Sequence, residues 1–294
     1  MSFKINIITI NVILLFFMSL NIYSEWKPLK GEPFIHYYSG TTGKLAFRHV
    51  ERPENTKTIL FFYGFSGNII MMTRLIANLQ NEYNIIVVDY PGHGYSPQSD
   101  GFDISAFNRD VHSLLEQKGI HSVYVAGYSL GGIVALDYYQ SYSESVKKIM
   151  LLHTSAYFKS SPARTLYFEG IGNALRNNFI GTINDIAIPI LKDRYFTREL
   201  LKTSKKVTAL NNGESVINYF DVISNSNYNS MVDSIKCPVL VVCSTKDFLV
   251  PVKESLQMVK MIKDCRVMVF RNTGHLSIVS RPIFMAALLT DFIQ

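Results

Sequence analysis

The stretch VYVAGYSLGGIVA, residues 123–135, places a single serine between glycines, with apolar residues on either side. The apolar residues before the serine predict a buried strand, and those after it predict a helix. Between them, Gly127-Tyr128-Ser129-Leu130-Gly131 has the pattern G-x-S-x-G, whose glycines let a strand and a helix pack closely around a sharp turn. This pattern predicts that the Ser129 hydroxyl projects from the end of a strand. It also predicts that the Leu130 N–H lies at a helix N-terminus, where it can stabilise an anion.

Five further apolar runs have the composition of buried strands, and helical patterns alternate with them. Continuous apolar runs fit strands covered on both faces, and their alternation with helices predicts a doubly wound, mostly parallel α/β sheet. A turn at residues 39–43 adds one or two strands within residues 36–52. The expected strands are 58–63, 84–89, 122–126, 148–153, 239–244 and 266–270, and the expected helices are 71–81, 104–118, 131–142 and 254–263.

Residues 157–230 break this alternation because they contain helical stretches and no strand run. An insertion at this place predicts a helical cap over the carboxyl ends of the strands, where α/β sheets bind ligands. The sheet would then form from residues 25–156 and 231–294. The apolar residues of the cap either cover an acyl chain or pack the cap onto the sheet; they include Phe168, Phe179, Ile180, Ile183, Ile186, Ile188, Ile190 and Leu191.

The composition limits the classes of protein to which this chain can belong. Hydrophobic residues make up 48% and charged residues 18%, and no segment is of low complexity, so a packed core is expected. The formal charge is +6, but Lys and Arg are scattered and no basic block is interleaved with aromatics, so no nucleic-acid partner is expected. Cys237, Cys243 and Cys265 are odd in number and lack C-x-x-C spacing, which argues against a zinc site. A disulfide between Cys237 and Cys265 stays open as an alternative.

Residues 1–24 differ from the rest of the chain. Lys4 is their only charged residue, and the mostly apolar run of residues 5–20 follows it. This arrangement is typical of a secretory signal peptide, with an uncleaved membrane anchor and a buried N-terminal helix as alternatives. The segment therefore predicts an exported protein, periplasmic or secreted, or one anchored in a membrane.

A serine hydroxyl is a weak nucleophile at neutral pH and needs a base, which in turn needs an orienting acid. Among the seven histidines His275 is the candidate base, because it lies in a turn just after the last strand run. His93, on another loop at the same edge, is the second choice. Asp247 follows the run 239–244 and is the candidate acid, with the capping of the next helix as its alternative role.

A second backbone donor for the oxyanion is expected from the loop after an earlier strand. Tyr63-Gly64-Phe65-Ser66-Gly67 follows the run 58–63, and its glycines permit a turn that aims the Phe65 N–H at the serine. Phe65 and Leu130 are therefore the predicted oxyanion-hole residues. The alternative is that the glycines form only a strand-to-helix turn.

Together these motifs resemble the α/β-hydrolase family across residues 33–294. The chain order Ser129, Asp247, His275 matches the family order of nucleophile, acid and base. Residues 89–96, DYPGHGYS, resemble its D-x-x-G-x-G-x-S loop, and residues 247–251, DFLVP, its acid loop. Within the family the chain looks most like the capped branch of monoacylglycerol lipases, esterases and C–C hydrolases. One residue departs from the pattern, because Tyr63 stands where the family usually has histidine.

The residues and the resemblance together predict a serine hydrolase. Its substrate would be a carboxylic ester, small or lipid-like, cleaved through an acyl-enzyme with no metal or organic cofactor. Two alternatives stay open: a C–C bond hydrolase or perhydrolase with the same triad, and a non-catalytic binding protein that keeps the fold.

Overall fold

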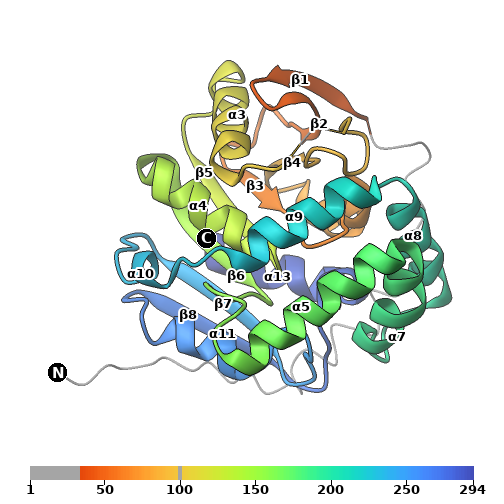
Figure 1. The fold of residues 1–294 in the computed structure, drawn as a ribbon. Helices are drawn as coiled ribbons and strands as arrows, with labels where there is room; N and C mark the ends of the chain where they lie inside the picture. Colours follow the sequence, from red (N-terminus) through yellow and green to blue (C-terminus); the bar gives the residue numbers. More distant parts are fainter. Residues whose placement is uncertain (1–33, 99–100) are drawn as a thin grey trace.

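The computed structural model describes residues 34–98 and 101–294, so the predicted signal or anchor segment lies outside the described residues. Its centre is an eight-stranded sheet with the strand order β1-β2-β4-β3-β5-β6-β7-β8 (Figure 1). Strands β3 to β8 all run parallel, while β2 is antiparallel to both of its neighbours. The strands are β1 (His36–Gly40), β2 (Gly43–Val50), β3 (Thr58–Phe62), β4 (Asn84–Val88), β5 (Val123–Tyr128), β6 (Val146–Leu152), β7 (Val239–Ser244) and β8 (Cys265–Phe270).

This sheet confirms the predicted doubly wound, mostly parallel α/β architecture. Each predicted strand is present with ends shifted by at most two residues, and β1 and β2 fill the region predicted for N-terminal strands. β5 extends to Tyr128 because Gly127 and Tyr128 still pair with β6, so the strand leads directly into the turn at Ser129.

Helices cover the sheet at the four predicted places, and two further helices, at residues 277–280 and 282–293, were not predicted. The core helices are η1 (Ile69–Met72), α2 (Thr73–Leu79), α3 (Ile104–Gln117), α4 (Gly131–Tyr142), η2 (Ser143–Ser145), α11 (Val252–Val259), α12 (Ser277–Ser280) and α13 (Pro282–Ile293). The helix predicted at 71–81 is shorter than expected, because a 3-10 turn capped by the Asn68 side chain precedes it. α2 packs against α13, and α4 packs against β5.

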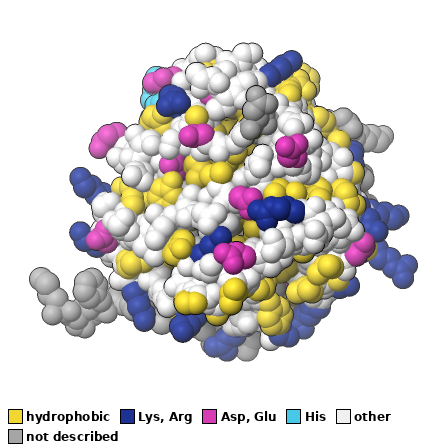
Figure 2. All heavy atoms as spheres, viewed as in Figure 1, with side chains coloured by type: hydrophobic (Ala, Val, Ile, Leu, Met, Phe, Trp, Pro, Cys, Tyr) yellow, Lys and Arg dark blue, Asp and Glu magenta, His cyan; other side chains and the backbone are white. Residues whose placement is uncertain are grey.

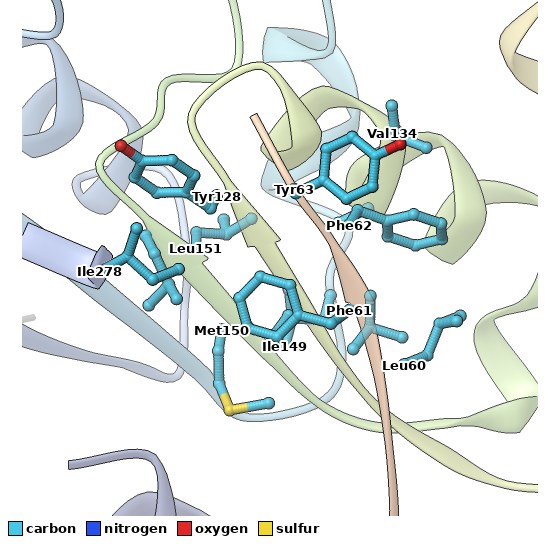
Figure 3. Packing of buried hydrophobic residues seen from close by; sticks show 14 of the residues in the cluster. Leu60, Phe61, Phe62, Tyr63, Tyr128, Val134, Ile149, Met150, Leu151 and Ile278 are labelled. Carbon is cyan, nitrogen blue, oxygen red and sulfur yellow. The ribbon is translucent and has the colours of Figure 1, made fainter. Parts of the chain in front are cut away.

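Burial on both faces explains why the strand sequences are apolar without alternation. Every residue of β3 and of β7 is buried. Successive side chains of a strand point to opposite faces, and Figure 3 shows Leu60 and Phe62 on one side of β3 and Phe61 on the other. Each fully buried side chain of this size contributes about 1.5–3 kcal/mol relative to an exposed one, so this sheet is a rigid base for the loops at its edge.

A run of helices lies between β6 and β7; we call residues 162–232 the helical insertion. It comprises α5 (Pro162–Asn177), α6 (Phe179–Gly181), the π-helix η3 (Thr182–Ala187), α7 (Ile188–Leu191), α8 (Arg198–Ala209), α9 (Gly213–Asn225) and α10 (Asn229–Val232). As predicted, it contains no strand. Tyr157, which precedes the insertion, and Asn227 within it form an isolated β-bridge. Figure 1 shows α5 and α9 side by side across one side of the sheet, and the two helices contact each other.

The surface of this side is mixed. Figure 2 shows positive and negative side chains interspersed on it, with apolar side chains between them. Leu166 and Tyr167 of α5 contribute to the exposed apolar surface. Within residues 34–98 and 101–294, no helix combines the length and the hydropathy that a membrane span requires.

The three cysteines are free thiols, so the disulfide kept open between Cys237 and Cys265 is not formed. Among the described residues, no group of three or more His, Cys, Asp and Glu side chains is placed to hold a metal ion.

Candidate active site

Ser129 lies on the sharp turn between β5 and α4. Its φ of +54° is in the left-handed region, which for a residue other than glycine costs about 1–3 kcal/mol and is typical of functional sites. The Ser129 N–H continues the sheet ladder by donating to the Leu152 carbonyl at 2.8 Å. Both flanking glycines are required, since a Cβ at Gly127 would lie 2.6 Å from the Gly131 carbonyl oxygen and one at Gly131 would meet the backbone of Phe62 and Tyr63. This geometry is that of the predicted nucleophile turn.

The structure brings Ser129, His275 and Asp247 together. They follow β5, β8 and β7, whose carboxyl ends lie at one edge of the sheet because the strands are parallel. His275 Nε2 lies 2.9 Å from Ser129 Oγ, and His275 Nδ1 lies 2.7 Å from Asp247 Oδ2. A carboxylate only accepts hydrogen bonds, so Nδ1 carries the proton and Nε2 is free to accept from the serine hydroxyl. All three residues are buried.

Asp247 is held by its own loop as well as by His275. Its Oδ1 accepts hydrogen bonds from the N–H groups of Leu249 at 3.0 Å and Val250 at 2.8 Å. Burial alone would raise the pKa of Asp247, but the neighbouring imidazoles of His275 and His153 together hold the pKa below its ordinary value. The alternative role as a helix cap is wrong, because the N-cap position of α11 belongs to Pro251.

The second-choice base, His93, is engaged elsewhere. Its Nδ1 lies 3.1 Å from the Pro91 carbonyl oxygen, and its ring packs among Tyr63, Tyr90 and Tyr219. Burial lowers the pKa of His93 to about 4. His275 is the histidine that contacts Ser129.

The two predicted oxyanion-hole segments lie beside Ser129. A Cβ at Gly64 would be 2.8 Å from the Ser129 Cβ, so the loop after β3 passes directly against the serine. Within the described part of the chain, neither the Phe65 N–H nor the Leu130 N–H donates a hydrogen bond. Ser66, next to Phe65, has a φ of +56°, which marks a second strained turn at this edge. The backbone thus supplies two unused donors near the serine.

Tyr63 takes the position at which the family usually has histidine and joins two loops. Its hydroxyl donates to Asp89 Oδ1 at 3.1 Å and accepts from the Tyr90 N–H at 2.9 Å, while the Tyr90 hydroxyl donates to the Tyr63 carbonyl. Asp89 also accepts from the N–H groups of Ile69 and Tyr95. Burial raises the pKa of Asp89 to about 7 despite these hydrogen bonds. The tyrosine therefore connects the loops after β3 and β4.

Sequence reasoning missed residues that position the site. The Tyr128 hydroxyl donates to the His275 carbonyl oxygen at 3.0 Å, which ties the base loop to the residue before the serine. His153, at the end of β6, places its Nδ1 3.4 Å from Asp247 Oδ2. Its position at the carboxyl end of a predicted parallel strand is a sequence signal that it lies at the edge of the sheet with the site. A histidine is not selected there when only a carboxylate is expected as the acid.

The helical insertion contacts the loops that carry the site. Asn211 donates to the Ser66 carbonyl at 2.9 Å and accepts from the Gly94 N–H at 2.9 Å. Asp193 accepts from the Ser280 hydroxyl at 3.1 Å, five residues after His275. The insertion therefore lies over the carboxyl edge of the sheet, where the sequence places it.

The apolar residues expected to cover an acyl chain or pack the insertion onto the sheet differ in burial, and Phe179 and Leu191 are partly buried. Phe168, Ile183 and Ile188 are buried, whereas Ile180, Ile186 and Ile190 are about half exposed. The exposed three do not pack the insertion onto the sheet, because the short helices α6, η3 and α7 turn one side toward solvent. Phe65 contacts Phe220 of α9 with ring centroids 5.2 Å apart, and Phe220 stacks on Phe168 at 5.9 Å. These three rings form an apolar contact between the insertion and the oxyanion loop.

Comparison with known proteins identifies the family of this chain. The family model for the alpha/beta hydrolase fold matches residues 57–282. A pimeloyl-[acyl-carrier protein] methyl ester esterase from Neisseria meningitidis serogroup C is 24% identical, and the match covers 82% of this chain and 95% of that protein. Lipase 1 from Psychrobacter immobilis is 27% identical, and the match covers 75% of this chain and 72% of that protein. The structure of an esterase from Exiguobacterium antarcticum superposes with a TM-score of 0.80 at 18% identity, covering 88% of this chain and 99% of that one. The chain belongs to the alpha/beta hydrolase fold family, and esterases and lipases are among its relatives.

Proposed function

We propose that this protein is a serine hydrolase that cleaves carboxylic esters, small or lipid-like, through an acyl-enzyme. One observation carries the proposal: Ser129, His275 and Asp247 are linked by contacts of 2.9 and 2.7 Å at the end of parallel strands. Nucleophile, base and orienting acid in this order are the arrangement that activates a serine hydroxyl. Esterases and lipases among the relatives favour an ester over other substrates.

The chemistry follows from the positions of the atoms. His275 Nε2 takes the Ser129 proton as Oγ bonds to the ester carbonyl carbon, and the Asp247 carboxylate stabilises the imidazolium that forms. The carbonyl oxygen becomes an oxyanion, for which the N–H groups of Phe65 and Leu130 are the proposed donors. The tetrahedral intermediate collapses by breaking the bond to the alcohol oxygen, which receives the proton from His275. Water then repeats the sequence, releasing the acid and restoring the serine.

The helical insertion is the proposed source of specificity. Ser129 is only 2% exposed, so a substrate has to pass beneath or beside the insertion to reach it. The rings of Phe65, Phe168 and Phe220 border the oxyanion loop and suit an apolar acyl group. These features support placing the protein in the capped, monoacylglycerol lipase-like and esterase-like branch of the family.

The test is turnover of p-nitrophenyl esters from acetate to palmitate by the full chain, with Ser129→Ala beside it. We expect turnover by the wild type and a loss on the order of 10⁶-fold in kcat for Ser129→Ala. The chain-length profile then reports the size of the acyl site. No turnover of any ester by folded wild type would contradict the proposal, and cleavage of a β-diketone without ester turnover would identify a C–C hydrolase instead.

We propose further that residues 1–24 direct the protein out of the cytoplasm or anchor it in a membrane, because Lys4 is followed by an apolar run. Fractionation of cells expressing the full chain tests this. Recovery of the protein in the cytoplasm at full length would contradict it.

A further inference from the structure

A second imidazole contacts the same oxygen of Asp247 that holds the proposed base. His153 Nδ1 lies 3.4 Å from Asp247 Oδ2, and His275 Nδ1 lies 2.7 Å from that atom. The two rings are 5.9 Å apart between centroids, and His153 is fully buried. The side chain reaches this place because β6 lies next to β7 in the sheet, so the residue after β6 meets the loop after β7.

The hydrogen bond on the other side of the ring determines which nitrogen carries the proton. His153 Nε2 lies 2.5 Å from Ser277 Oγ, and the serine hydroxyl can donate to it. The ring is neutral, since burial lowers the pKa of His153 more than Asp247 raises it. With Nε2 accepting, Nδ1 carries the single proton. This buried N–H makes no aligned hydrogen bond in the structure, and the acceptor beside it is Asp247 Oδ2, 3.4 Å away.

The backbone conformation of His153 indicates that the surrounding structure holds this residue in place. Its φ is +50°, a conformation that costs about 1–3 kcal/mol for a residue other than glycine and persists only where the surroundings enforce it. Its N–H donates to the Val242 carbonyl at 2.7 Å, so the strand ladder holds it on β7. The titratable groups that face this position from the neighbouring elements are Asp247, His275 and Tyr128, with Asp193 of the insertion further away.

We propose that His153 is a positioning residue of the Ser129–His275–Asp247 site. By donating from Nδ1 to Asp247 Oδ2, it keeps the carboxylate ionised and oriented toward His275, while Ser277 holds the tautomer. This inference rests on the proposed function. It extends the linked chain to five side chains: Ser277, His153, Asp247, His275 and Ser129.

Two substitutions separate this role from simple packing. In His153→Asn the side-chain amide stands at the place of Nδ1 and can still donate to Asp247, and asparagine tolerates positive φ. In His153→Gln the amide stands at the place of Nε2, so it reaches Ser277 and leaves Asp247 without its donor. We expect His153→Asn to keep kcat within about fivefold of wild type. We expect His153→Gln to lose on the order of 10–100-fold in kcat while KM stays within about twofold, as is typical for loss of a supporting hydrogen bond. If the role were structural and acted through Ser277, Gln would be the better replacement. Equal activity of both variants, or a more active Gln variant, would overturn the proposal.

A readout independent of turnover keeps the inference separate from the proposed function. The proton between His275 Nδ1 and Asp247 should give a low-field NMR signal, retained in His153→Asn and shifted or broadened in His153→Gln. The nitrogen shifts of wild-type His153 should also report a protonated Nδ1 and a bare Nε2. A protonated Nε2 in the wild type would refute the inference even if the esterase activity is confirmed. Conversely, these NMR signals can support it if no ester is turned over.

Discussion

Replacing Gly131 with alanine tests the close approach that builds the serine turn. Gly131 is the first residue of α4, and a Cβ there would meet the carbonyl oxygens of Phe62 and Tyr63. These atoms belong to the backbone at the end of β3, which cannot rotate away as a side chain would. Overpacking of a core costs about 1–3 kcal/mol, so we expect Gly131→Ala to lower the free energy of unfolding by about 3 kcal/mol, at the upper end.

The chain provides a matched control for the same substitution. Gly170 lies inside α5, and a Cβ there would meet no atom within 4 Å. Alanine is the better helix former, so Gly170→Ala should raise the free energy of unfolding by about 0.5–1 kcal/mol. The two variants should therefore shift in opposite directions in urea-induced unfolding followed by circular dichroism.

Activity adds a second readout to this pair. The shift forced by Gly131→Ala displaces the neighbouring Leu130 N–H, and loss of one oxyanion donor typically costs 10²–10³-fold in kcat, so we expect a loss of at least about tenfold. Gly170→Ala should keep wild-type kcat. Wild-type stability and activity of Gly131→Ala would refute the packing around the serine turn described here.

Three further predictions concern the supporting residues. Tyr128→Phe removes the hydrogen bond to the His275 carbonyl and should cost about 1 kcal/mol of stability and several-fold in kcat, measured by urea unfolding and ester turnover. Asn211→Ala leaves the buried Ser66 carbonyl without its donor and should cost about 1–3 kcal/mol, with a larger fall in kcat than in substrate affinity. Asp89 should take up its proton near pH 7 in a carbon NMR titration, since burial raises its pKa to about 7. Because the folded chain then binds a proton that the unfolded chain has released, Asp89 lowers the stability progressively as the pH rises from about 4 through 7.

Each of these predictions has a result that contradicts it. Tyr124→Phe, on the same strand, and Asn177→Ala, at the exposed end of α5, are the matched controls and should behave as wild type. Variants at Tyr128 or Asn211 that match their controls would remove the positioning roles. An Asp89 carboxyl that titrates below pH 4 would show that its hydrogen bonds outweigh burial.

The strands and the serine turn were predictable from the sequence because their signals are local. A continuous apolar run such as residues 58–62 already specifies a strand buried on both faces, and G-x-S-x-G specifies the turn within five residues. His275 and Asp247 followed from one further step, since both come directly after parallel strands.

The supporting contacts could not be predicted because they join distant parts of the chain. The position of His153 at the end of a predicted strand indicates only the edge of the sheet at which it lies. Its contact with Asp247 depends on the pairing of β6 with β7, which no local pattern specifies. Asn211, in the helical insertion, contacts Ser66 across 145 residues of sequence, so no local pattern indicates the pair. The exposure of Ile186 and Ile190 likewise depends on how the short helices pack, which apolar periodicity does not determine.

The most direct test of the central claim is the site of covalent labelling by a fluorophosphonate, located by mass spectrometry of peptides. Wild type, Ser129→Ala and the control Ser122→Ala, which changes a serine just before β5, would be treated under identical folded conditions. We expect a single phosphonylated residue, Ser129, in the wild type and in Ser122→Ala, and no labelling of Ser129→Ala. An unlabelled Ser129 in folded wild type, or equal labelling of Ser129→Ala, would contradict the assignment of Ser129 as the activated nucleophile.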